Sequence, residues 1–216
     1  MGNILHIGIP SAFENSLFQL GRVVVVSMIA LFGTYQTSAN AVANNLDSLG
    51  TLIGQAMGLA MVTVVGQCVG AGDTDQAVYY LKKIMLWCYL VQGATNVLIL
   101  AFLPNLVDLY GSLSPEARAL SIQLVWIHAG CAILLWPVAF VLPNALRAAN
   151  DVRFTMLVSV GSMAVFRVFL SWILCVQMGM GATGVWIAMV VDWICRVSFF
   201  LGRTLSGKWK TKYVPA

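Results

Sequence analysis

Long apolar stretches separated by short polar connections run along the chain almost from its start to residue 203. A helix that crosses the hydrocarbon core of a bilayer needs about 20 mostly apolar residues. Six stretches reach that length, and the links between them leave no room for a soluble domain. The pattern therefore predicts an all-α membrane protein, a bundle of six transmembrane helices. The expected helices are 9–32, 39–69, 78–103, 115–149, 152–177 and 184–203.

Two of the expected helices have start signals in the sequence. Asp73 is a candidate N-cap for the third helix, with Gln76 at the position of a capping box. Before the fourth helix, Ser114 is a candidate N-cap, Pro115 suits the first helical position, and Glu116 interacts favourably with the helix dipole. These signals place the third and fourth helices to within a few residues.

The fourth helix is too long for the membrane if it is straight. At about 1.5 Å per residue, the stretch 115–149 exceeds the ~30 Å hydrocarbon core. Pro137 and Pro143 each remove a backbone hydrogen bond, so we expect a kink or unwinding there. Broken helices persist in membranes only where protein or a water-filled cavity satisfies the backbone. This helix is therefore expected to border a cavity.

The composition agrees with a membrane protein. The chain is 60% hydrophobic and 9% charged, with a mean hydropathy of +0.86, whereas soluble domains contain about 25% charged residues. The five cysteines are scattered singly through apolar segments, without a C-x-x-C pair. Neither a disulfide framework nor a metal site is predicted.

Basic residues predict how the chain is oriented, because Lys and Arg are enriched in cytoplasmic connections. With six spans, they fall on one side, and both termini are expected to be cytoplasmic in the cell membrane. The six-helix unit is expected to be 1–206, followed by a basic cytoplasmic tail, 207–216. The basic residues concerned are Lys82, Lys83, Arg147, Arg153, Arg203, Lys208, Lys210 and Lys212.

The first helix carries a polar stripe. Ser11, Asn15, Gln19 and Arg22 recur at spacings of four, four and three residues, with Glu14 beside them. Such a stripe lies on one helix face. It indicates either hydrogen bonds that lock the bundle or the wall of a cavity.

Further polar residues lie on the second and fourth helices. Asn44 and Asp47 belong to ANNLDSLG, and His128 lies well inside the fourth helix. Intramembrane ionisable residues usually face the bundle interior or a transport pathway. Asp47 is close enough to the outer end of its helix to lie among lipid headgroups instead. A lone histidine such as His128 is more often a hydrogen-bonded core residue than a proton relay.

Charged residues on the last two helices predict a buried network. Asp192 and Arg196 are four residues apart and can pair directly. Arg167, well inside the membrane on the preceding helix, is positioned to join them. We interpret the three as a structural charge network.

No motif indicates an enzyme. Residues 70–73 spell the GxGD of intramembrane aspartyl proteases, but Asp73 lies in a polar surface turn, where it fits a helix cap better. The chain has no zinc-protease, lipase-type or P-loop motif.

The polar segments together resemble the second half of bacterial multidrug and toxic compound extrusion (MATE) transporters. GIPSAFENSLFQLGR at 8–22, ANAVANNLDSLG at 39–50 and GQAMGLAMVTVVGQCVGAGDTDQA at 54–77 carry the likeness. LPNALRAANDVRFTM and GVWIAMVVDWICR agree with the same half. The resemblance covers essentially the whole chain, in the right order.

The resemblance implies one lobe of a twelve-helix fold, with this chain as helices seven to twelve. Such transporters exchange drugs or organic cations for protons or sodium through a cavity between two lobes. The implied partners are the bilayer, a small-molecule substrate and an N-terminal lobe, covalent or separate; neither a cofactor nor nucleic acid is implied. Family members often have a Pro followed four residues later by Glu on the seventh helix, matched by Pro10 and Glu14. Cavity or coupling candidates are Glu14, Asn15, Gln19, Arg22, Asn44 and Asp47.

Two departures from the family bear on the coupling ion. Sodium-coupled members have carboxylates at positions that correspond to Phe18 and Trp136. Protons are therefore expected rather than sodium, with coupling through an aspartate of the first lobe. The alternatives are a flippase for lipid-linked oligosaccharides of the same superfamily and a non-transporting fragment of a truncated gene. The flippases hold pyrophosphate with several arginines, for which only Arg22 and Arg167 are candidates here.

Overall fold

A computed structural model describes the backbone of residues 2–111 and 113–209 and the side chains of residue 12 and of 16–111 and 113–209. All regular secondary structure in these residues is helical. The elements are α1 (Gly2–Ala30), α2 (Thr34–Gly70), α3 (Thr74–Ala101), α4 (Leu103–Asp108), α5 (Pro115–Trp136), η1 (Pro137–Val141), α6 (Leu142–Ala148), α7 (Val152–Ser162), η2 (Met163–Leu170), η3 (Ile173–Gln177) and α8 (Gly181–Leu205).

The helices correspond to the six expected spans, and the all-α membrane fold is confirmed. Five helical segments in the described residues are long and apolar enough to cross a membrane. The remaining span is α1, whose described apolar part is Ser16–Ala30. The fourth span consists of α5, η1 and α6, and the fifth of α7, η2 and η3. The chain is therefore a multi-pass membrane protein.

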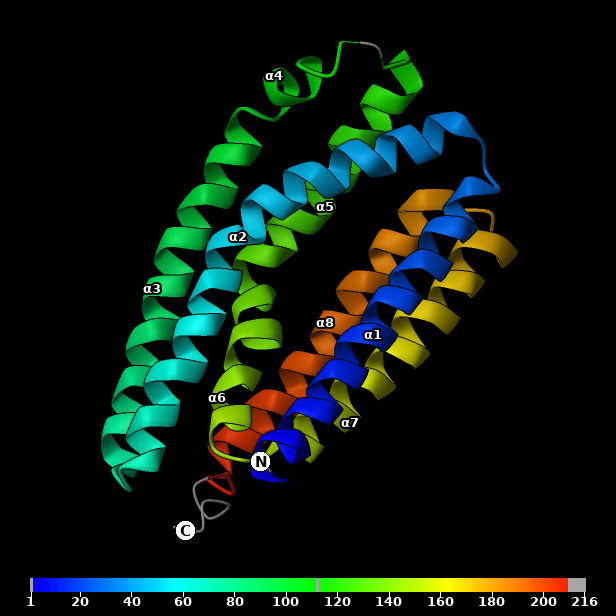
Figure 1. The fold of residues 1–216 in the computed structure, drawn as a ribbon. Helices are drawn as coiled ribbons and strands as arrows, with labels where there is room; N and C mark the ends of the chain where they lie inside the picture. The colour runs from blue at the N-terminus through cyan, green and yellow to red at the C-terminus, as the bar shows by residue number, and fades with distance from the viewer. Residues whose placement is uncertain (1, 112, 210–216) are drawn as a thin grey trace.

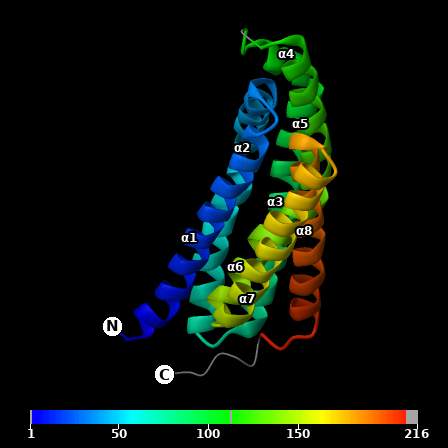
Figure 2. The ribbon, with the colours of Figure 1, turned by 90° about the vertical axis from the view of Figure 1, so that its right-hand side faces the viewer.

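The helices form two groups that lie side by side. One group contains α2, α3 and the α5–α6 helix, and the other contains α1, α7 with η2, and α8 (Figure 1). Contacts of α8 with α5 and η1 join the two groups. All spans run along one long direction (Figure 2). The start of α1, the turns α2–α3 and α6–α7, and the end of α8 lie at the same end of the bundle (Figure 1).

The helix-start predictions are confirmed. The Asp73 carboxylate accepts a hydrogen bond from the Gln76 backbone N–H at 2.9 Å. The Ser114 hydroxyl accepts one from the Ala117 N–H at 3.2 Å, with Pro115 at the first helical position. These bonds satisfy backbone donors that have no partner inside the helix.

One short helix, α4, was not predicted by the apolar pattern. It lies in the connection before α5, and an ion pair joins its last residue to that helix. Arg118 Nε lies 2.5 Å from Asp108 Oδ1, and its Nη2 donates to Oδ2 at 3.0 Å. The hydrogen bond from Arg118 holds the pKa of the Asp108 carboxyl below its ordinary value.

The long fourth span changes its winding at the proline pair. Pro137 begins a π-helical stretch that ends at Val141, and Pro143 lies in the first turn of α6. Each proline lacks an N–H, so the carbonyl four residues earlier loses its usual partner. π-helical turns in membrane and soluble helices frequently mark functional sites. The fourth span therefore stays helical but is wound irregularly at Pro137–Val141, beside the cavity described below.

Two apolar cores hold the bundle together, one toward each end. The first joins the second half of α2, the start of α3, α6 and the end of α8, with Met61, Leu146 and Phe200 fully buried. The second joins the end of α1, the start of α2, α4 and the start of α8 around Leu46 and Trp186. The polar residues of the bundle interior lie largely between these cores.

Asn40→Leu is expected to destabilise the bundle by about 1–3 kcal/mol, since a buried donor left without an acceptor costs that much. Asn40 Oδ1 accepts the indole N–H of Trp186 at 2.9 Å, and both residues are buried. The measurement is the midpoint of thermal unfolding in detergent. Asn45→Leu, an exposed position on the same helix, is the matched control. Equal shifts in the two variants would contradict this role of Asn40.

Candidate functional site

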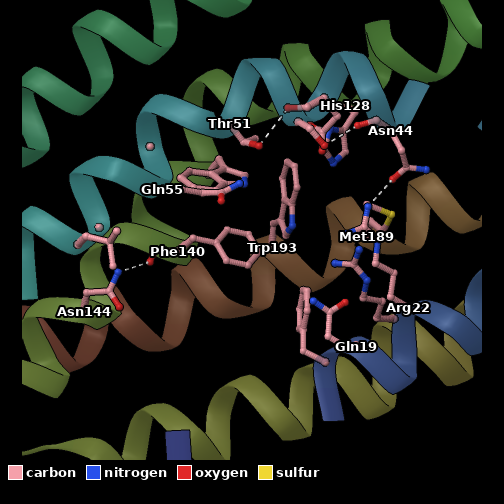
Figure 3. A pocket seen from close by; sticks show the side chains of 18 of the residues that line it. Gln19, Arg22, Asn44, Thr51, Gln55, His128, Phe140, Asn144, Met189 and Trp193 are labelled. Atoms are coloured by element: carbon pink, nitrogen blue, oxygen red, sulfur yellow. Dashed lines mark hydrogen bonds and ion pairs between the residues drawn. The ribbon is translucent and has the colours of Figure 1, made fainter. Parts of the chain in front are cut away.

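A polar cavity of about 430 Å³ opens between the two helix groups. Its walls come from α1, α2, α5 with η1 and α6, η2 and α8. Figure 3 shows its side chains converging from these helices, with α2 on one side and α1 and α8 on the other. Drug-sized ligands occupy pockets of about 300–1,000 Å³. The cavity is large enough for a small molecule.

Four of the six predicted cavity or coupling residues line this space. They are Gln19 and Arg22 on α1, and Asn44 and Asp47 on α2. The structure thus brings two helices, α1 and α2, to the same cavity from opposite sides. The other two candidates, Glu14 and Asn15, lie on α1, but their side chains are outside the described residues.

A chain of polar contacts connects this wall to the bundle core. Arg22 Nη2 lies 3.5 Å from Asn44 Oδ1, and Asn44 Nδ2 donates to Asn40 Oδ1 at 3.1 Å. The same Asn40 oxygen accepts from Trp186. Asn44 is thus held by Asn40, and Arg22 reaches the same side chain from α1.

Asp47 contacts His128, and both residues line the cavity. Asp47 Oδ1 is 2.7 Å from His128 Nδ1, with the Asp47 side chain 23% exposed and that of His128 2% exposed. Within the described part of the chain, neither imidazole nitrogen has a well-aligned hydrogen bond. The imidazole lies between the rings of Trp186 and Trp193, at centroid distances of 4.8 and 4.3 Å. A carboxylate and an imidazole in contact can share or exchange a proton.

Aromatic rings form the opposite wall. Trp136 and Phe140 stack at a centroid distance of 5.1 Å, and Trp193 contacts Phe140 edge-on at 6.0 Å. Figure 3 shows Phe140 and Trp193 facing the cavity from different helices. Phe18 and Trp136, at the positions where the resemblance implies carboxylates, both line the cavity. They present ring surface where sodium would need oxygen ligands.

Asp192 and Arg196 of the predicted charge network form an ion pair, and Arg167 and Arg196 lie over the same Phe18 ring. Arg196 Nε donates to both carboxylate oxygens of Asp192, at 3.2 and 3.0 Å, and Arg196 Nη2 donates to the Ser159 carbonyl. Arg167 makes no ion pair with them among the described residues. Its guanidinium lies over the Phe18 ring instead, 4.9 Å from the centroid, and it lines the cavity. Its position on η2 places it on the cavity side of the pair.

Several cavity residues were not singled out from the sequence. Arg147 was assigned to a cytoplasmic connection, but it lies in the last turn of α6, half-buried, where its Nη1 donates to Asn144 Oδ1 at 2.9 Å. The available signal in the sequence was that Asn144 and Arg147 lie close to Pro137 and Pro143, where the irregular helix is expected to border a cavity. Others that line it are Ser48, Thr51, Gln55, Asn144, Met189 and Trp193.

The described residues contain no cluster of three His, Cys, Asp or Glu side chains that could hold a metal ion.

A model of the MatE family matches residues 10–173. Curated relatives include an "uncharacterized transporter" of Bacillus subtilis, YisQ, which is 28% identical over 195 residues. The match covers 88% of this chain and 42% of that protein. The "probable multidrug resistance protein NorM" of Thermotoga maritima is 24% identical over 98% of this chain and 45% of its own length. The chain thus spans less than half the length of these relatives.

Solved structures share the fold. A MATE protein in a "bent conformation" superposes with a TM-score of 0.85 at 18% identity, over 96% of this chain and 46% of that one. A MOP superfamily transporter from Pyrococcus furiosus gives a TM-score of 0.84 at 17% identity, over 91% and 43%. That transporter is described as having a binding pocket of reverse polarity that suggests a different function. In each case the likeness covers one half of the solved chain.

Proposed function

This chain belongs to the MatE family, and we propose that it forms the C-terminal lobe of a secondary active antiporter that exports drug-like molecules. The observation that carries the proposal is the polar and aromatic cavity in the middle of a six-helix membrane bundle. Binding sites of such transporters lie near the bilayer midplane, where two repeats meet. The proposed function is transport, not catalysis.

The other half of the transport site is proposed to come from an N-terminal lobe, joined covalently or supplied separately. Alternating access then proceeds by rocking one lobe against the other around the shared cavity. We place both termini of this lobe in the cytoplasm and the protein in the cell membrane. The basic residues near the α2–α3 and α6–α7 turns and after α8 support this orientation.

Protons are the proposed coupling ion. Phe18 and Trp136 leave the cavity without the carboxylates that the resemblance implies for sodium. Asp47 and His128 offer a proton-binding pair within this lobe, in addition to the aspartate expected in the first lobe. Among the described charged residues, Arg22 on α1, Arg147 on α6 and Arg167 on η2 line the same cavity as the pair. The positive charges of these arginines therefore act on both the bound substrate and the proton-binding pair.

The experiment that tests the transport proposal is dye efflux from cells. Cells that make this chain together with a first lobe are compared with cells that make either part alone. Efflux above background only when both lobes are present is expected, because a single lobe encloses half a cavity. No efflux from any combination, with both lobes present in the membrane in normal amounts, contradicts the proposal.

One alternative gains support from the geometry. Three arginines, Arg22, Arg147 and Arg167, line the cavity, where the sequence suggested two. Several arginines are what a flippase for lipid-linked oligosaccharides uses to hold pyrophosphate. Translocation of a purified lipid-linked sugar, without dye efflux, would assign that function. A non-transporting fragment would fail to accumulate in the membrane unless a first lobe is supplied.

Glu14→Gln is expected to lower efflux severalfold at unchanged expression, since the resemblance implies a functional carboxylate at this position of α1. The measurement is the initial efflux rate of the assembled two-lobe transporter. Glu116→Gln, in the first turn of α5 and outside the cavity, is the control. Full activity of Glu14→Gln would remove Glu14 from the mechanism.

A further inference from the structure

Among the described residues that line the cavity, arginines outnumber carboxylates. They include Arg22, Arg147 and Arg167. Asp47 is the single carboxylate in that described lining. A second, smaller cavity of about 140 Å³ shares Phe18, Phe140 and Arg147 with the first and adds Arg196. The field inside this space therefore favours negatively charged groups.

Arg167 is a buried arginine that makes no hydrogen bond or ion pair with the described side chains. It is 8% exposed, and its Nε is buried without a hydrogen-bond partner. The described part of the chain offers its guanidinium no hydrogen bond or ion pair, and the guanidinium lies over the Phe18 ring, 4.9 Å from its centroid. Buried guanidinium groups are normally paired, because desolvating a charge without a partner costs several kcal/mol.

The described carboxylates nearby are already engaged. Asp192 is fully buried and accepts two hydrogen bonds from Arg196. Asp47 contacts His128 at 2.7 Å. The guanidinium of Arg167 lies over the ring of Phe18, which offers no oxygen atom to accept a hydrogen bond. Among the described residues, no carboxylate therefore pairs with Arg167, which lines the cavity.

We propose that Arg167, together with Arg22, forms a subsite for an anionic oxygen group, a carboxylate or a phosphate, on the molecule that this cavity binds. The inference deepens the proposed transport function and rests on it for the role of the ligand. A guanidinium matches such oxygen groups because its N–H donors can bind two oxygens at once. Arg22 is held toward the same space by its 3.5 Å contact with Asn44.

The aromatic wall of the cavity indicates the chemical character of the rest of the ligand. Trp136, Phe140 and Trp193 surround the same cavity with mutual ring contacts. Rings of this kind stack on flat apolar groups and exclude water. The ligand class is thus an amphipathic aromatic anion, in contrast to the organic cations that the family resemblance implies.

The test uses the 216-residue chain in nanodiscs of neutral phosphatidylcholine. Binding of four matched probes is measured by equilibrium dialysis: naphthalene-2-carboxylate, 2-naphthyl phosphate, 2-naphthylmethanol and 2-naphthylmethylammonium. The two anions are expected to bind at least about tenfold more tightly than the alcohol, which corresponds to about 1.4 kcal/mol. The ammonium probe is expected to bind most weakly. An ammonium probe that binds as tightly as the carboxylate overturns the proposal.

Arg167→Gln and Arg22→Gln are each expected to remove most of that tenfold preference, while binding of the neutral alcohol is unchanged. Arg153→Gln, which removes an exposed arginine outside the cavity, is the matched control and is expected to retain the preference. Folding is monitored by the thermal unfolding midpoint without probe. Because Arg167 has no hydrogen bond or ion pair with the described side chains, Arg167→Gln is expected to unfold at the same or a higher temperature. Unchanged anion preference in folded Arg167→Gln and Arg22→Gln overturns the proposal.

A further arm separates the two sources of such an anion. The carboxylate titration is repeated in nanodiscs that contain phosphatidylglycerol. A severalfold loss of apparent affinity assigns the subsite to a lipid headgroup, and unchanged affinity assigns it to a soluble ligand; both support an anion subsite. Because binding is measured without transport, loss of anion binding with intact efflux refutes this subsite alone. Anion binding without efflux refutes the proposed transport function and leaves the subsite standing.

Discussion

Asp47→Asn is expected to lower proton-driven efflux to less than about a tenth of the wild-type rate, because cavity-facing acids in membranes mark proton pathways. The carboxylate is 23% exposed to the cavity and lies 2.7 Å from His128. Asparagine keeps the shape and the hydrogen-bonding oxygen but binds no proton. Exchange of labelled for unlabelled substrate, which needs no net proton movement, is expected to fall less. The measurement is the initial rate of efflux with and without an imposed pH difference.

Two controls separate proton binding from structure in that experiment. Asp47→Glu keeps the titratable group and is expected to retain part of the coupled rate. Asp75→Asn removes an exposed carboxylate from the first turn of α3, outside the cavity, and is expected to have no effect. Equal coupled rates in wild type and Asp47→Asn would show that protons are bound elsewhere, such as in the first lobe.

Gly184→Ala is expected to destabilise the bundle by about 3 kcal/mol, the upper part of the range for overpacked cores. A Cβ at Gly184 would lie 2.8 Å from the carbonyl carbon of Leu174, 2.9 Å from its oxygen and 3.0 Å from the Cys175 nitrogen. These are backbone atoms, which cannot rotate away as a side chain can. Helix α8 must therefore shift from η3 to accept the methyl group. The measurement is the thermal unfolding midpoint in detergent.

Gly202, on the same helix, gives the matched control. A Cβ there meets no atom within 4 Å. Gly202→Ala is expected to stabilise the protein by about 0.5–1 kcal/mol, because alanine favours a helix over glycine. Both substitutions replace glycine by alanine. Stability changes of opposite sign would therefore be due to the close backbone contact at Gly184. The same sign at both positions contradicts the packing described here.

The helices could be predicted from the sequence because their signals are local. Apolar length sets the spans, and the caps at Asp73 and Ser114 set where two of them begin. Helix α4 was missed because a short helix in a connection has no apolar periodicity of its own. The π-helical stretches η2 and η3 contain no proline to reveal them, unlike η1, which begins at Pro137.

The cavity was only partly predictable, because helix rotation and tertiary distance are not local properties. The stripe of Gln19 and Arg22 marks one face of α1, and that face does line the cavity. The distance of Asp47 from the helix end placed it equally well in headgroups, and only its packing against α5 brings it to His128. The Asp192–Arg196 spacing predicts a pair on one helix, whereas the separation of Arg167 from it depends on how η2 packs.

The measurement that tests the central claim most directly is substrate-induced loss of a pH gradient. Everted membrane vesicles containing this chain and a first lobe are energised so that their interior becomes acidic. Adding a transported compound is expected to dissipate the gradient in wild type, and much less in Asp47→Asn, because each substrate entering releases protons. A gradient that no transported compound affects, or one lost equally in both proteins, would contradict a proton-coupled antiporter that uses this cavity.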